Sequence, residues 1–137
     1  MTPTVLKRQD LIYPELCFKI VGVLLNVYGA LGYGLYEKTY QKAVAVGLAK
    51  SNLLFIEQLY APIMFENKIV GKNYFDFLVE NKVVVELKRG DKFSKAHIDQ
   101  VYNYLVAKKL QLGILAYFSP SGLHYKRIVN IIYRVGS

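Results

Sequence analysis

The chain has 137 residues, 53% of them hydrophobic, which is enough to bury the core of one domain without disulfide bonds. Lysine and arginine total 18 against 10 acids, and the formal charge of +8 favours an anionic partner, nucleic acid first. The single cysteine, Cys17, cannot form an internal disulfide, and we find neither a signal-peptide pattern nor an apolar stretch long enough to span a bilayer. We therefore expect one soluble, cytoplasmic domain over residues 1–137, without membrane contact.

Two helical patterns open the chain. Apolar residues recur at the spacing of one helix face over residues 13–30. Gly32 and Gly34 then interrupt the pattern, as expected of a turn, and a second helix is predicted over residues 35–50. Gly47 lowers the helix propensity of this second segment and indicates close packing there.

The rest of the chain is rich in strand patterns. These patterns cover residues 53–65, 73–79, 83–88, 112–118 and 123–132. Pro62 places the first strand at a sheet edge or a bulge, Gly71 marks a further break or bulge, and Ser94 is a candidate N-cap for a helix over residues 94–108. The order, ααβββαββ, predicts an α/β (α+β) fold in which helices flank a mixed β-sheet.

Three charged residues, Asp76, Glu86 and Lys88, lie within two strongly apolar strand patterns, where charges are rare without partners. Strand alternation puts Glu86 and Lys88 on one face, and a tight turn centred near Asn81 sets Asp76 opposite Glu86. Facing carboxylates repel unless a cation lies between them, and hard divalent cations take such oxygen ligands. Lys88 could orient an attacking water or stabilise charge on a phosphate, so the trio suits metal-assisted phosphodiester hydrolysis.

A simpler explanation is open for these charges. On a solvated sheet face, Lys88 would neutralise Glu86 or Asp76 in an ordinary ion-pair ladder, and spacing alone gives both explanations equal weight. Glu37 lies in the first turn of the second predicted helix, where a negative charge is favourable near a helix N-terminus even without any function.

Polar residues of the helix predicted over residues 94–108 could likewise belong to a functional site or have an ordinary structural role. Gln100 and Tyr104 share a helix face and could hold a phosphate or a metal-bound water, or they could simply mark the boundary of an amphipathic helix. We expect His97 to be a partly exposed histidine at the helix start and assign no role to His124.

Four short motifs resemble one known family. Residues 34–40, GLYEKTY, match the signature of the GxxExxY proteins, small bacterial and archaeal domains in the PD-(D/E)xK nuclease superfamily. The strand of Asp76 and the sequence Glu86-Leu87-Lys88 resemble the two halves of the superfamily motif, although Phe75 stands where its proline would be. Residues 100–104, QVYNY, resemble the QxxxY helix motif of the RecB-like branch, and the likeness extends over about residues 13–127.

The resemblance implies a restriction-endonuclease-like α-β-β-β-α-β core and a metal-dependent nuclease acting on DNA more than on RNA. It implies that Asp76 and Glu86 bind one or two Mg²⁺ ions, with Mn²⁺ as an alternative and the Leu87 carbonyl as a further ligand. Glu37 would complete the metal shell directly or through water.

The same resemblance assigns the remaining roles. Lys88 would be the catalytic lysine, and Gln100 and Tyr104 would be auxiliary contacts to phosphate or water. A domain this small covers few base pairs, so a homodimer with two sites is conceivable. The alternative is a non-catalytic module with a nuclease-like fold, which binds nucleic acid or another protein.

Overall fold

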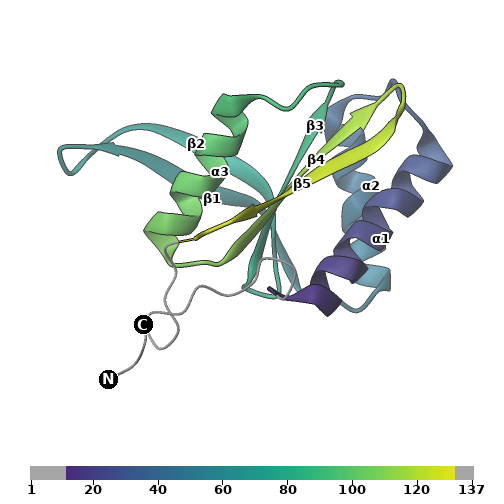
Figure 1. Cartoon of the computed structure of the whole chain (residues 1–137), viewed down its shortest axis with the longest axis horizontal. Helices are drawn as coiled ribbons and strands as arrows, with labels where there is room; N and C mark the ends of the chain where they lie inside the picture. Colours follow the sequence, from purple (N-terminus) through teal and green to yellow (C-terminus); the bar gives the residue numbers. More distant parts are fainter. Residues whose placement is uncertain (1–11, 132–137) are drawn as a thin grey trace.

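The computed structural model describes residues 12–131, and its elements follow the expected order (Figure 1). They are α1 (Pro14–Leu31), α2 (Glu37–Lys50), β1 (Phe55–Phe65), β2 (Lys68–Val79), β3 (Val83–Arg89), α3 (Lys95–Lys108), β4 (Leu112–Ser119) and β5 (Gly122–Val129). The predicted order ααβββαββ is thus confirmed. β2 begins earlier than predicted and continues through Gly71, because the break there is a bulge: the β1–β2 register shifts between Ile63 and Met64. Ile132, the predicted end of the last strand, lies outside the described residues.

The five strands form one mixed sheet in the order β1-β2-β3-β4-β5. β3 and β4 pair in parallel through the α3 crossover, and the other neighbouring strands pair antiparallel. β1 is an edge strand, as Pro62 predicted. The β1–β2 hairpin projects beyond α3 in Figure 1.

Two core clusters pack on the two faces of this sheet. Val83, Val85 and Leu87 belong to the cluster beneath α1 and α2, whereas Val84 belongs to the cluster beneath α3. The alternation predicted for β3 is therefore confirmed, and it leaves Glu86 on the α3 side by its position in the strand.

α1 packs on α2 at the glycine that the sequence singled out. A Cβ atom at Gly47 would lie 2.6 Å from Val23 Cγ1, so only glycine allows this approach. α1 has 18 residues and a mean hydropathy of 1.4, so it is long and apolar enough to cross a membrane, contrary to our expectation. That is weak evidence, because a core helix passes the same test, and Ile20 and Leu24 of α1 are fully buried.

The loop between α1 and α2 is held by Tyr40, which is fully buried. The Tyr40 hydroxyl donates a hydrogen bond to the Gly32 carbonyl at 2.6 Å and accepts one from the Leu35 N–H at 3.3 Å. Its ring stacks on Phe118 at 4.1 Å between centroids. The last residue of the GxxExxY-like segment is therefore part of the core and fixes the loop that precedes Glu37.

Tyr40→Phe should lower the free energy of unfolding by about 1–3 kcal/mol, because it leaves two backbone groups without a partner while keeping the ring. Urea denaturation of the two proteins measures this difference. Tyr36→Phe, in the same loop but 78% exposed, is the matched control and should change stability by less than about 0.5 kcal/mol. Equal stability of all three proteins would contradict the anchoring role of the Tyr40 hydroxyl.

Candidate active site

The predicted pairing of β2 with β3 is confirmed, and the site lies where that pairing ends. Glu80 and Asn81 have φ values of 53° and 55°, and the Lys82 N–H donates to the Val79 carbonyl at 2.9 Å. These values describe a tight turn, across which Val79 pairs with Val83. The register that it sets would place Asp76 opposite Glu86.

The backbone ladder stops one pair before these two carboxylates, at Phe77 and Val85. Beyond that pair, backbone N–H groups bond to side chains. The Asp76 N–H donates to Glu86 Oε1 at 3.0 Å, and the Leu87 N–H donates to Asp76 Oδ2 at 2.7 Å. Each carboxylate therefore accepts a hydrogen bond from a backbone N–H of the other strand. These two bonds hold Asp76 and Glu86 together where the strands separate.

An irregularity in the neighbouring strand accompanies this divergence. Gln58 of β1 lies opposite Asp76, has a φ of 53°, and forms no ladder pair with it. On either side of Asp76, Phe77 packs in the core beneath α1 and α2, whereas Phe75 packs in the core beneath α3. In a regular strand, residues two apart point to the same sheet face. The side-chain alternation of β2 is therefore interrupted at Asp76.

Burial gives the two acids unusual proton affinities. Glu86 is only 8% exposed, and its burial, followed by the adjacent Asp76 carboxylate, raises its pKa to about 8. Burial also raises the pKa of Asp76, although hydrogen bonds from Glu86 and Leu87 oppose the rise. In the metal-free protein at neutral pH, the pair therefore holds a proton, which a divalent cation would displace.

Lys88 lies next to this pair, with its Nζ 3.5 Å from Glu86 Oε2. The side chains of Lys88 and Glu86 are 22% and 11% exposed, so they do not form an ion-pair ladder on a solvated sheet face. A lysine held beside this carboxylate pair can offer its charge to an anion that enters the site.

Glu37 opens α2 and reaches the far end of β3, where its Oε2 accepts a hydrogen bond from the Arg89 N–H at 2.9 Å. Its charge is near enough to raise the pKa of Asp76. Within residues 12–131, however, no three His, Cys, Asp or Glu side chains gather closely enough to hold a metal ion together. The role of Glu37 as a metal ligand, direct or through water, therefore stays a prediction.

The donor set that is gathered fits Mg²⁺ chemically. Asp76 and Glu86 offer carboxylate oxygens, and the raised pKa of each means that its charged form lacks a neutralising cation. Mg²⁺ is typically held in proteins by one or two carboxylates, with water and substrate phosphate filling its other positions. The Leu87 carbonyl, on the strand beside them, stays a predicted further ligand.

Gln100 and Tyr104, the two predicted auxiliary residues, lie on α3. The Tyr104 ring packs edge-on against Phe75 at 5.2 Å between centroids, and burial raises the pKa of its hydroxyl. Gln100 is exposed. For neither side chain does the described part of the chain show a hydrogen bond to Asp76 or Glu86, so their auxiliary roles stay predictions.

Sequence analysis missed one contact at this site, between His97 and Tyr117. His97 Nδ1 lies 2.9 Å from the Tyr117 hydroxyl, although the sequence suggested only a histidine at a helix start. The available signal was Tyr117 itself, which places a hydroxyl near the end of the apolar pattern of β4.

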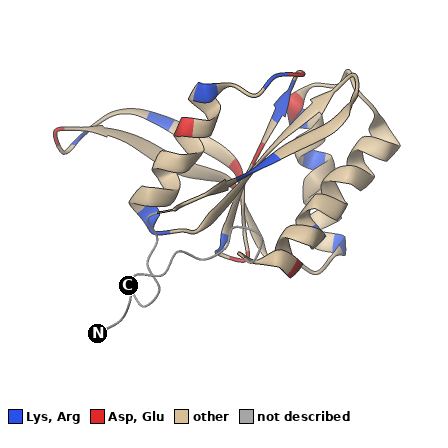
Figure 2. Cartoon of the chain, in the orientation of Figure 1, with Lys and Arg blue, Asp and Glu red and all other residues tan. Residues whose placement is uncertain are grey.

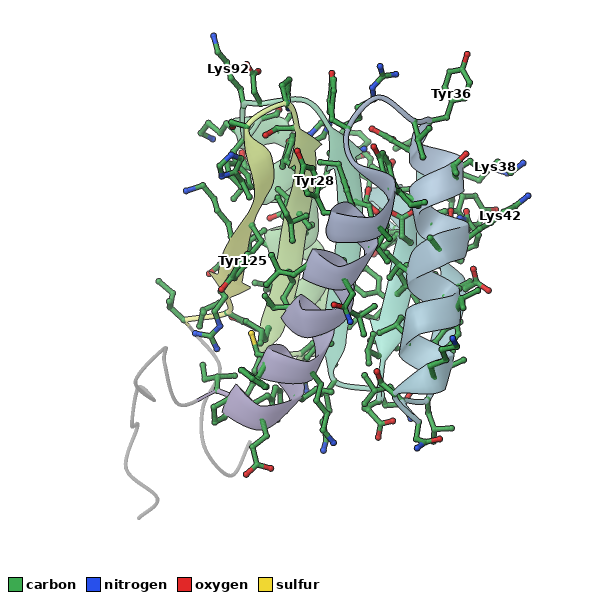
Figure 3. The ribbon with its side chains drawn as sticks, turned by 90° about the vertical axis from the view of Figure 1, so that its right-hand side faces the viewer. Tyr28, Tyr36, Lys38, Lys42, Lys92 and Tyr125 are labelled. Carbon is green, nitrogen blue, oxygen red and sulfur yellow. The ribbon has the colours of Figure 1, made fainter. Side chains whose placement is uncertain are left out.

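Near the end of β3, the ribbon in Figure 2 carries acidic and basic residues in neighbouring elements. Arg89 lies over the ring of Tyr33, 5.4 Å from its centroid. Tyr36 and Lys92 extend from one end of the molecule in Figure 3, and Lys38 and Lys42 extend from the outer side of α2.

Comparisons with known proteins gave a distant structural likeness and a family match. The crystal structure of SSO0001 resembles the chain with 20% sequence identity and a TM-score of 0.49, over 89% of this chain and 59% of that one. The chain thus spans less than two thirds of that structure, and so distant a likeness carries no functional argument. No curated protein gives a significant match. The family model of the PD-(D/E)XK nuclease superfamily matches residues 14–128, and the chain therefore belongs to this superfamily.

Proposed function

We propose that the protein is a metal-dependent nuclease that hydrolyses phosphodiester bonds, in DNA rather than RNA. The observation that carries this proposal is the pairing of half-buried Asp76 with buried Glu86, with Lys88 Nζ at 3.5 Å from Glu86. The formal charge of +8 suits a polyanionic substrate.

Each of these residues has a definable task in that reaction. Asp76 and Glu86 would hold Mg²⁺, which when bound would sharpen the water nucleophile and neutralise phosphate charge. Lys88 would bind the phosphate or the attacking water and stabilise the negative charge that develops on the phosphate oxygens. Glu37, bonded to the Arg89 N–H, would keep α2 against the end of β3 and so hold the rim of the site in place.

A cleavage panel tests this function. Purified protein should cut at least one of single-stranded, duplex, flap or junction DNA in Mg²⁺ or Mn²⁺, cut RNA more slowly, and stop in EDTA. If none of these substrates is cut with either metal, the nuclease proposal fails. Binding that weakens steeply with salt but leaves the nucleic acid intact would then favour a non-catalytic nucleic-acid-binding module.

A further inference from the structure

The hydroxyl of Tyr117 links the first turn of α3 to β4 by hydrogen bonds. Tyr117 is buried, with 3% of its surface exposed. This hydroxyl accepts a hydrogen bond from the Ser94 N–H at 3.2 Å and lies 2.9 Å from His97 Nδ1. The Ser94 N–H can only donate, so the hydroxyl hydrogen of Tyr117 has a partner when it points to His97 Nδ1. In that orientation the bond favours the neutral imidazole tautomer that carries its proton on Nε2.

The same contact holds the imidazole over the sheet face that carries Lys88. Tyr117 pairs with Lys88 in the parallel β3–β4 register, and paired residues project as neighbours from one sheet face. That face is the one beneath α3, because Tyr117 belongs to the α3-side core cluster. His97 is also close enough to Lys88 and Glu37 for both charges to act on its pKa.

The surroundings of His97 favour its neutral form. Burial and then the charge of Lys88 lower its pKa, and Glu37 offsets part of that change. A neutral ring adds no repulsion beside Lys88. With Nδ1 bonded to Tyr117, the polar hydrogen on Nε2 is the one that the ring can offer to a ligand, and N–H donors bond strongly to anionic oxygens.

We propose that His97 is a further phosphate-binding residue of this site, whose Nε2–H donates a hydrogen bond to a non-bridging phosphate oxygen beside Lys88. Tyr117 is its positioning residue, since it acts only by fixing the tautomer and orientation of the ring. The proposal takes its substrate from the proposed nuclease function, but its tautomer and its anion contact can be measured without any cleavage.

Two substitutions of His97 separate its two nitrogens. A glutamine side chain carries its N–H donors near the reach of Nε2, whereas asparagine ends near the position of Nδ1. His97→Gln should therefore cleave within about tenfold of the wild-type rate, and His97→Asn should be about 10- to 100-fold slower than His97→Gln. His124→Gln is the matched control, because the Nε2 of His124 is bonded to Ser121 at 2.9 Å, and it should cleave at the wild-type rate. Equal rates for the two His97 variants, or the opposite order, overturn the proposal.

Nitrogen NMR of ¹⁵N-histidine-labelled protein supplies the readout that needs no cleavage. Above the pKa of His97, the wild type should show a bare Nδ1 and a protonated Nε2. In Tyr117→Phe the two resonances should move toward those of a free imidazole, which exchanges between both tautomers. Inorganic phosphate should shift the Nε2 resonance saturably in the wild type. A protonated Nδ1, or an Nε2 resonance that phosphate leaves unmoved, overturns the role of His97. If the wild type cuts no nucleic acid, the nuclease proposal fails separately, while the phosphate titration still decides this one.

Discussion

Lys88→Met should lower the turnover number for cleavage by about 10²- to 10³-fold while leaving the protein folded and able to bind nucleic acid. Methionine keeps most of the apolar stem of Lys88 but removes the charge that lies 3.5 Å from Glu86. Glu86→Gln should be at least as damaging, because it replaces a carboxylate of the proposed metal site with a neutral amide of the same shape. Steady-state kinetics with the best DNA substrate of the cleavage panel gives both effects.

Two further variants control for the change of charge and for contaminating nucleases in these kinetic measurements. Lys42→Met removes a lysine from the outer side of α2, and Glu57→Gln removes an exposed carboxylate from β1, so both variants should cleave at the wild-type rate. If Lys88→Met and Glu86→Gln cut as fast as these controls, the reaction does not occur at this site.

In EDTA, the protein should lose stability as the pH rises from about 5 to about 8. An unfolded glutamate titrates near pH 4.5, whereas the pKa of folded Glu86 is about 8. Between these values the folded state binds more protons than the unfolded state, so the free energy of unfolding falls with rising pH. A shift of this size corresponds to about 5 kcal/mol at most, and the raised pKa of Asp76 acts in the same direction.

Urea denaturation of wild type and Glu86→Gln across this pH range measures the effect. Glutamine cannot ionise, so the variant should be more stable than the wild type at pH 8 and should lose this advantage near pH 5. Mg²⁺ at pH 8 should stabilise the wild type more than the variant, because a bound cation replaces the proton between the carboxylates. Wild-type stability that does not change between pH 5 and 8 in EDTA would refute the shared proton.

The arrangement of the carboxylates was predictable where local rules decide it. The alternation of apolar residues in β3 put Glu86 and Lys88 on one face, and the turn at Asn81 fixed the register of Asp76. Both rules act within a single hairpin, so they need no knowledge of the rest of the fold. Gly47 was predictable for a related reason, since a glycine inside a helix lowers propensity and calls for a packing explanation.

Sequence rules could not predict what depends on contacts between distant segments. The backbone pairing of β2 with β3 stops at Phe77 and Val85. Next to this point Gln58 has a positive φ, and no glycine or proline in the sequence marks that position. Nor could spacing show that the Tyr40 hydroxyl bonds to the loop before Glu37. The contact between His97 and Tyr117 likewise forms only after the α3 crossover has brought β4 next to β3.

The position of the carboxylates within the β2–β3 hairpin has a consequence for the order of folding. Asp76 and Glu86 are ten residues apart in the chain, so a short loop brings them together. The parallel pairing of β3 with β4 must instead close a longer loop around α3, at a larger entropic cost. The two charges would therefore meet while water still screens their repulsion, and the cost of burying them would fall on the later docking of α3.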